Sequence, residues 1–268
     1  MKQRRLGITP EALARRRFLR RAAGGGSAAL LGGCDRLGQN ETFARLLSTG
    51  EALSRGVRSA VRGAGTTTTM AQEFTPADLS PTFRGNGNVD PAGADYKAMV
   101  ANGFADWKLA VDGLVEAPAA YSLAELHALP ARTQITRHDC VEGWSAIGQW
   151  TGVPLGHVLA LVKPQPQARY VVLHCADTFG EGTDETPYYE SIDLHDAHHP
   201  QTLLAYGLND QPLPTTNGAP LRLRVERQLG YKHAKYVMRL ELVSDFGHIG
   251  DGKGGYWEDQ GYQWYAGI

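Results

Sequence analysis

The sequence predicts an α+β fold with a mixed β-sheet, and two observations carry this prediction. Short apolar or alternating runs that are typical of strands are scattered over residues 107–243. Short helical segments lie between them, but strands and helices do not alternate regularly as they do in a parallel βα fold. Apolar residues make up 42% of the 268 residues, which is enough for a sizeable core, and the 21% of charged residues is too few for a disordered tail protein.

Each expected element has a local signal. Trp107, Leu109 and Val111 alternate with other residues, Asp112-Gly113 is a turn dipeptide, and Leu114-Val115 is apolar again, so this range predicts a β-hairpin that turns there. Ser122-x-x-Glu125 predicts the capped start of a short helix. Pro154 predicts the start of another helix that runs to about Val162. Further strands are expected at residues 169–175, 188–192, 203–206, 221–225 and 235–243.

The charge is distributed unevenly along the chain. Residues 1–33 hold eight basic residues and one acidic residue, so the remainder carries 19 basic and 27 acidic residues. An acidic domain repels a phosphate backbone, so no nucleic-acid partner is expected. No run of 18 apolar residues occurs, which argues against a conventional membrane span.

The N-terminus has the features of an export signal. Residues 14–20 read Ala-Arg-Arg-Arg-Phe-Leu-Arg and resemble the twin-arginine signal, and a weakly hydrophobic Gly/Ala-rich stretch follows. That stretch ends in Leu31-Gly32-Gly33-Cys34, which resembles a bacterial lipobox. A lipidated Cys34 would anchor the protein to the inner membrane surface. The alternatives are simple cleavage of the signal without a lipid, or an ordinary basic N-terminal helix.

These signals divide the chain into three parts. We expect an export signal in residues 1–33, an arm and flexible linker in 34–74, and the catalytic domain in 75–268. The expected location is the periplasm. Twin-arginine export carries folded proteins, often because a cofactor is inserted before export, so the signal directs attention to cofactor-binding residues.

The segment around Cys140 is the first candidate site. It reads Arg137-His138-Asp139-Cys140-Val141-Glu142, and its polar, turn-rich composition predicts a loop. Arg137 and His138 would lower the pKa of a nearby thiol, and a thiolate binds metals or attacks electrophiles. A lone cysteine is otherwise a small core residue. A zinc site is disfavoured, because the candidate ligands do not have zinc spacing; they are His138, Cys140, His174 and Cys175.

Two further segments have residues suited to a phosphate or another polar ligand. Asn217-Gly-Ala-Pro-Leu-Arg222 offers an amide and a guanidinium just before a predicted strand. Gly230-Tyr-Lys232-His233-Ala234-Lys235 offers backbone N–H groups and two ammonium groups. Neither segment matches a nucleotide-binding motif, so nucleoside triphosphates and NAD are disfavoured. Alone, each is equally consistent with solvated strand ends.

Together these segments resemble the molybdopterin-binding domain of the sulfite oxidase superfamily, in its bacterial exported form. The resemblance covers roughly residues 80–243. It implies a sulfite-oxidase-type fold and a molybdenum–molybdopterin cofactor with Cys140 as the metal ligand. Further site residues follow from it: Arg137, His138 and Glu142 beside the metal, and Asn86, Cys175, Asn217, Arg222, Lys232, His233, Ala234 and Lys235 at the pterin and its phosphate. A pterin-contacting Thr of the family is replaced by Cys175, which leaves that contact open.

The resemblance also implies an activity and its partners. Such a cofactor transfers oxygen atoms in two-electron steps, so the expected reaction moves an oxygen atom to or from a small molecule, with either sulfoxide reduction or sulfite-type oxidation. About 25 residues follow Val243, too few for the C-terminal immunoglobulin-like dimerisation domain of some relatives, and no haem-attachment motif occurs. We therefore expect a monomeric catalytic subunit that exchanges electrons with a separate cytochrome or haem membrane subunit.

Two other functions fit parts of the sequence. Cys140 and His138 could form the dyad of a cysteine-nucleophile hydrolase, since alternate residues of a strand point the same way. The aromatic C-terminal segment after Gly250 could cover the mouth of the site, or dock a partner in a non-enzymatic periplasmic lipoprotein, although packing across the domain is the plainer expectation. Molybdenum content separates these hypotheses.

Overall fold

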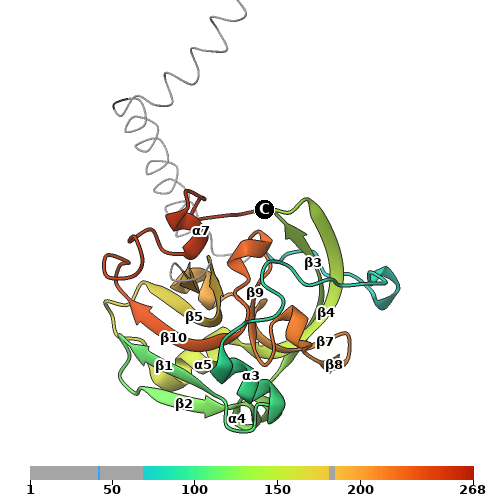
Figure 1. Ribbon diagram of the computed structural model, residues 1–268, viewed down its shortest axis with the longest axis horizontal. Helices are drawn as coiled ribbons and strands as arrows, with labels where there is room; N and C mark the ends of the chain where they lie inside the picture. The colour runs from blue at the N-terminus through green and yellow to red at the C-terminus, as the bar shows by residue number, and fades with distance from the viewer. Residues whose placement is uncertain (1–41, 43–68, 181–184) are drawn as a thin grey trace, which may run out of the picture. The chain divides into compact units, whose positions relative to one another are not determined.

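The computed structural model describes residue 42, residues 69–180 and residues 185–268, and these last two ranges form one body (Figure 1). The predicted export signal, Cys34 and most of the predicted arm lie outside the described residues. Within the described ranges, no helix is both long and apolar enough to cross a lipid bilayer.

Two sheets build the described body. The first sheet has the strand order β2-β1-β10-β5-β6. Its pairs are antiparallel except for β1 and β10, which run parallel, so the sheet is mixed. Its strands are β1 (Lys108–Gly113), β2 (Ala119–Ser122), β5 (Tyr170–Phe179), β6 (Thr186–Asp193) and β10 (Val237–Val243).

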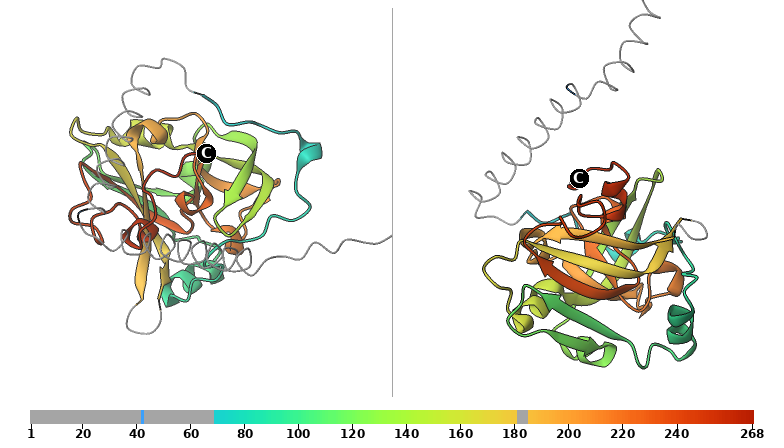
Figure 2. Two further views of the ribbon diagram at one scale, coloured as in Figure 1. Left: turned by 90° about the horizontal axis from the view of Figure 1, so that it is seen from above. Right: turned by 60° about the vertical axis from the view of Figure 1, so that its left-hand side comes forward.

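The second sheet is antiparallel and has the order β3-β4-β7-β8, with β9 paired to β7. It lies beside the first sheet, as Figure 2 shows from two further sides. Its strands are β3 (Arg132–Cys140), β4 (Trp144–Pro154), β7 (Thr202–Leu208), β8 (Gln211–Pro212) and β9 (Arg222–Val225).

The helices are short and connect or cover the strands. The α-helices are α3 (Ala94–Ala101), α4 (Leu123–Ala128), α5 (Leu155–Val162), α6 (Leu194–Ala197) and α7 (Tyr256–Asp259), and the 3-10 helices are η1 (Pro76–Asp78), η3 (Thr215–Asn217) and η4 (Gly230–Lys232). Ser122 and Glu125 form the predicted capping box of α4. Pro154 directly precedes α5, whose inward face is apolar, so both predicted helices are confirmed.

The main hydrophobic core joins both sheets and α5. Fully buried side chains from β1, β5 and β10 pack with residues of β7, β9 and α5 in one cluster. This packing holds β7 and β9 of the second sheet against β1, β5 and β10 of the first. The α+β class with a mixed sheet is therefore confirmed.

Two local predictions were wrong. The chain does not form a tight hairpin at Asp112-Gly113, because β1 continues through Gly113 and its antiparallel partner is β2, which begins at Ala119. Gly113 has φ +80° and passes close to the Leu242 carbonyl, so it allows the strand to end against β10 rather than to reverse. The segment before Cys140 is a strand rather than a loop: β3 pairs with β4 along its whole length.

Candidate active site

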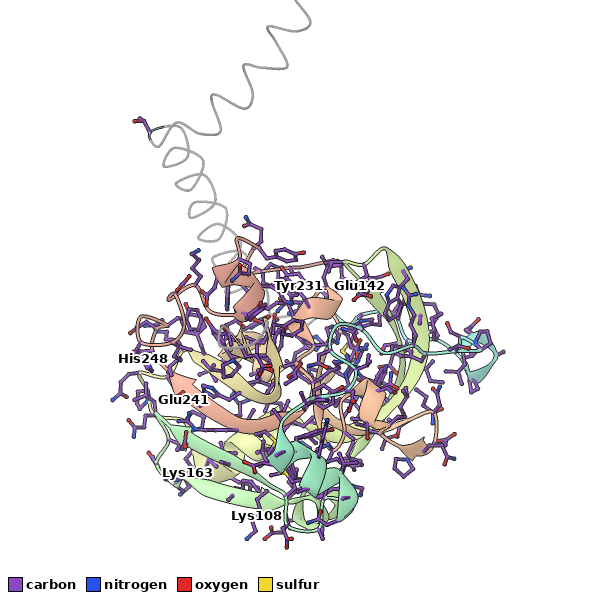
Figure 3. All side chains as sticks on the ribbon, viewed as in Figure 1. Lys108, Glu142, Lys163, Tyr231, Glu241 and His248 are labelled. Atoms are coloured by element: carbon purple, nitrogen blue, oxygen red, sulfur yellow. The ribbon has the colours of Figure 1, made fainter. Side chains whose placement is uncertain are left out.

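The site is a cavity of about 220 Å³ between the ends of the two sheets. Cys140, Val141 and Glu142 border it from the end of β3 and the β3–β4 connection, and Gly230, Tyr231, His233 and Lys235 border it from η4 and the residues after it. Figure 3 shows Glu142 and Tyr231 side by side at this edge of the molecule. The remaining lining residues are Asn86, Gly87, Asn88, Asp177, Phe179, Tyr188, Trp257 and Tyr262.

Cys140 is the last residue of β3 and lies at the wall of this cavity with 9% of its surface exposed. Burial raises the pKa of its thiol, and this outweighs the lowering effect of the Glu142 backbone N–H and of the Arg84 and Arg222 charges. Without a metal, Cys140 is therefore a protonated, poor nucleophile. Coordination to a soft metal would remove this proton, so a cysteine in this position can serve as a metal ligand.

Strand alternation explains why Arg137 does not join the site. In β3, Thr136, His138 and Cys140 point inward, while Arg137 lies on the outer face, where it binds Asp139 at 3.0 Å with 57% of its side chain exposed. The expectation that Arg137 and His138 together lower the Cys140 pKa was wrong, because Arg137 points away and His138 is uncharged.

His138 is buried and neutral. Its pKa is lowered well below the usual value, first by burial and then by the charges of Arg224, Arg222 and Lys235. Its Nδ1 lies 3.0 Å from the Arg224 guanidinium, which can only donate, so Nδ1 accepts and Nε2 carries the hydrogen. That Nε2 has no hydrogen-bond partner in the described structure. His138 thus offers one unused donor beside the cavity and does not pair with Cys140 as a hydrolase dyad requires.

Glu142 fixes the mouth of the cavity. Its carboxylate accepts hydrogen bonds from the Trp144 indole at 2.9 Å and from the Gly87 backbone at 3.1 Å. These two bonds lower the pKa of Glu142, so it is ionised at neutral pH. The same bonds join the segment around Gly87 to the β3–β4 connection, and Arg84 lies over the Trp144 ring at 4.6 Å.

Asn86 and Lys235 meet across the cavity. The Lys235 ammonium donates to the Asn86 backbone carbonyl at 2.5 Å and also to that of Asn88. Burial lowers the pKa of Lys235, with Arg222 as the next cause, while burial raises the pKa of Asp177, which also lines the cavity. The Asn86 side-chain oxygen has no partner and remains available for a ligand.

The two polar segments singled out in the sequence come together behind Cys140. His233 is 3% exposed, its ring lies 5.0 Å from that of His138, and its Nδ1 has no partner. Arg222 is fully buried over Trp150 and uses one nitrogen to hold the Asn217 carbonyl, while its Nε and Nη2 have no partner. Ala234 is buried, and its backbone carbonyl accepts a hydrogen bond from the Leu223 backbone N–H at 2.7 Å.

Three of the expected cofactor contacts have other partners in this structure. Lys232 is fully buried and forms ion pairs with Glu190 and Glu258, each at 2.5 Å, so its ammonium is occupied by two carboxylates. Cys175 packs in the main core on β5, and its thiol is not among the groups that line the cavity. The Asn217 amide donates to the Phe83 carbonyl at 3.3 Å.

The unpartnered polar atoms indicate which kind of ligand fits the site. Buried donors and acceptors are nearly always satisfied in proteins, yet several at or behind this cavity are not. They belong to Asn86, His138, Asp177, Arg222 and His233. Two buried cations, Arg222 and Lys235, favour a ligand with negative charge. These groups, with one cysteine, fit molybdopterin, which has a phosphate, a polar ring system and a soft metal that takes a thiolate.

Replacing Arg222 tests this fit. We expect Arg222→Met to reduce bound molybdenum by more than about tenfold. Loss of a residue that supports a metal site without binding the metal typically lowers metal affinity or activity 10- to 100-fold. Stability of the cofactor-free protein should stay equal or rise by about 1–2 kcal/mol, since a buried guanidinium with two unpartnered nitrogens is removed. Metal analysis and chemical unfolding of the cofactor-free form check both. Full molybdenum content with a large loss of stability would contradict the assignment.

Sequence reasoning missed Asp177 and Phe179 in the cavity, and it expected only of the C-terminal aromatic segment as a whole that it could cover the site mouth. Asp177 and Phe179 lie at the end of β5, and Trp257 and Tyr262 come from the C-terminal segment. No local motif marks them, because they reach the cavity only through the pairing of β5 with β10 and the folding of the C-terminal segment over β6. That segment both packs on the domain, as expected, and borders the cavity.

Comparison with known proteins gives the site a family. The "Oxidoreductase molybdopterin binding domain" family model matches residues 97–247. The Azospira oryzae protein named "Putative protein-methionine-sulfoxide reductase subunit YedZ1" is 39% identical over 263 residues, which cover 96% of this chain and 89% of that protein. The catalytic subunit MsrP of protein-methionine-sulfoxide reductase from Ralstonia nicotianae is 39% identical over 51% of this chain and 44% of its own.

A solved structure is also similar: the sulfane dehydrogenase SoxCD from Paracoccus pantotrophus shares 21% identity over 56% of this chain and 44% of its own, with a TM-score of 0.46.

The fold and the cysteine-centred cavity define a cofactor-dependent redox enzyme. The chain belongs to the molybdopterin-binding oxidoreductase family of the sulfite oxidase superfamily, and its cofactor is molybdopterin with molybdenum. Membership confirms the oxidoreductase class and sets aside the hydrolase and binding-lipoprotein hypotheses.

Proposed function

We propose that this protein is the catalytic subunit of an exported reductase that acts on methionine sulfoxide in proteins. The observation that carries the proposal is the position of Cys140 at the wall of a cavity with unpartnered polar groups. In addition, the chain is 39% identical to a relative that is named for this activity, and the match covers 89% of that relative. The chain spans less than half the length of the MsrP relative, so its substrate is inferred from the site as well as from that name.

The residues of the chain would hold the cofactor as follows. Cys140 would supply the thiolate ligand, Arg222 and His233 would contact the pterin, and Lys235 with the backbone of residues 233–235 would hold the phosphate. The cofactor supplies two-electron oxygen-atom transfer. The contact of Asn86 with the pterin and any ligand contact of Lys232, Cys175 and Asn217 remain predictions.

The reaction needs two protons and two electrons for each sulfoxide, which leaves a thioether and water. Glu142 is fixed by Trp144 and Gly87 at the mouth, where its ionised carboxylate can orient a water or pass a proton inward. His138 is held by Arg224 with its Nε2 hydrogen free, so it can donate a hydrogen bond toward a negatively charged oxygen. Burial of the floor of the cavity excludes bulk water from these contacts.

The electrons would come from a separate haem protein in the membrane. The relatives are named as subunits of a reductase, which supports a separate partner. The twin-arginine-like segment supports export to the periplasm, and the Leu31–Cys34 segment supports a lipid anchor that would keep the subunit at the inner membrane.

Purified cofactor-loaded protein tests the proposal. Molybdenum per chain is measured first, and then oxidation of a reduced viologen dye is followed with N-acetylmethionine sulfoxide and with a peroxide-oxidised protein rich in methionine. We expect about one molybdenum per chain and dye oxidation that depends on the sulfoxide. Sulfite oxidation with ferricyanide is the parallel assay. A folded protein without molybdenum, or one that only oxidises sulfite, would refute the proposed activity.

A further inference from the structure

One side of the cavity is built from aromatic rings, and all of them except Tyr231 lie outside the segments that resemble the family. Neighbouring ring centroids lie 5.0–5.9 Å apart within this aromatic wall. The rings that line the cavity are Phe179, Tyr188, Tyr231, Trp257 and Tyr262. Two of them, Trp257 and Tyr262, come from α7 and the segment after it, which lie at the edge where Tyr231 and Glu142 are labelled (Figures 1 and 3).

The wall presents mainly ring faces and edges rather than hydroxyl groups. The Tyr188 hydroxyl donates to the Tyr231 carbonyl at 2.7 Å, and the Tyr231 hydroxyl donates to the Gln263 carbonyl at 2.6 Å. The Trp257 indole N–H has no hydrogen-bond partner among the described residues, whereas that of Trp264 is bound to Ser191 at 2.8 Å. The wall therefore offers mainly apolar area, with the Trp257 N–H and the Tyr262 hydroxyl at the rim as polar groups that no described residue binds.

A buried ion pair and a ring contact fix the position of the aromatic wall. Glu258, next to Trp257, is 1% exposed and pairs with Lys232. Lys232 directly precedes His233, so the same short segment carries a proposed pterin contact and the anchor of the wall. Tyr262 packs edge-on against Tyr231 at 5.2 Å and is 43% exposed, which places it at the outer rim.

The cavity thus has two chemically different parts. The buried part near Cys140 is polar, with His233 and Lys235 3% and 5% exposed and Asp177 2% exposed. The outer part is aromatic. A sulfite or other small anion would gain little from this outer part, because ring faces carry negative charge density. A methyl sulfoxide has an apolar methyl group and a polarizable sulfur that pack on rings, and an oxygen that accepts hydrogen bonds.

We propose that Trp257 and Tyr262 form the substrate-recognition subsite for the S-methyl and methylene groups of a methionine sulfoxide side chain, with the Trp257 N–H available to its oxygen. This inference rests on the proposed function for the reaction but assigns the specificity to residues of this chain. The half-exposed rim suits a side chain that enters from a protein surface, while the backbone of the substrate stays outside.

The test compares Trp257→Ala and Tyr262→Ala with the ring-retaining Trp257→Phe and Tyr262→Phe, all in cofactor-loaded enzyme whose molybdenum content equals that of the wild type. Binding of a methionine-sulfone peptide, which keeps the methyl and methylene groups, is measured by calorimetry. Steady-state kinetics use N-acetylmethionine sulfoxide and dimethyl sulfoxide with reduced viologen. The binding arm does not depend on turnover.

We expect Trp257→Ala to weaken sulfone-peptide binding and raise KM for N-acetylmethionine sulfoxide by about tenfold, the size of effect that one lost apolar contact gives in specificity pockets. kcat should fall less than KM rises, KM for dimethyl sulfoxide should rise less, and Trp257→Phe should restore most of the binding. Unchanged binding in both alanine variants would overturn the subsite. Absence of sulfoxide turnover in a wild type that binds the sulfone peptide would refute the proposed reaction but keep the subsite.

Discussion

Cys140→Ser is expected to abolish most of the redox activity, with kcat reduced by more than about 100-fold. Loss of a residue that only contacts a metal ligand already lowers metal affinity or activity 10- to 100-fold. In this variant the ligand itself is replaced by a hydroxyl, which is harder and less acidic than a thiol. Arg222, His233 and Lys235 remain, so part of the pterin should stay bound while the metal signal changes. Metal analysis, the molybdenum electron-resonance spectrum and kcat are the measurements.

Cys175→Ala is the matched control for that experiment. Cys175 lies in the main core and its thiol does not line the cavity, so this variant should keep its molybdenum and lose some stability through the small void. If Cys175→Ala lost the metal and Cys140→Ser kept it, the ligand assignment would have to move to β5.

Lys232→Met is expected to destabilise the cofactor-free protein by about 3–5 kcal/mol, because it leaves Glu190 and Glu258 buried without their shared counter-charge. This is a large part of the 5–15 kcal/mol that stabilises a typical domain. Chemical unfolding of the cofactor-free protein measures it. If Lys232 instead served only the cofactor phosphate, the cofactor-free protein would keep its stability.

Two controls sharpen this experiment. The triple variant Lys232→Met/Glu190→Gln/Glu258→Gln removes the uncompensated charges and should recover most of the loss. Burial also raises the pKa of Glu190 well above its usual value. A carboxyl whose pKa is raised in the folded state favours folding at low pH and loses that contribution as pH rises, so the deficit of the single variant should shrink on acidification.

Local sequence signals were sufficient for several parts of the structure. The capping box of α4 and the apolar period of α5 involve residues within one or two helical turns, so their physics is contained in the sequence segment. The residues of the Cys140, Asn217–Arg222 and Gly230–Lys235 segments, and their order, resemble the family closely enough that the resemblance implied the cofactor, and the comparisons confirm both. Each of these features depends on residues that are close together in the chain, or on a motif that can be recognised from the sequence alone.

Other parts required the tertiary structure. Arg137 and Cys140 are three residues apart, but only the pairing of β3 with β4 and the burial of one face decided that Cys140 points inward and Arg137 outward. The composition around Cys140 indicated a loop because polar side chains fill the inner row of β3. That row is polar because it faces Arg222 and Arg224 of β9, which lie far away in the sequence.

By itself, then, the sequence determined the fold class, the two helices that begin at Ser122-x-x-Glu125 and at Pro154, the family, its cofactor and the cysteine at the site. Only the tertiary structure decided that Lys232 pairs with Glu190 and Glu258, which are 42 and 26 residues away, and that Trp257 and Tyr262 line the cavity. The physical reason is the same in each case. Burial removes water as a partner, so the role of a charged or aromatic side chain depends on the groups that distant segments bring within contact distance.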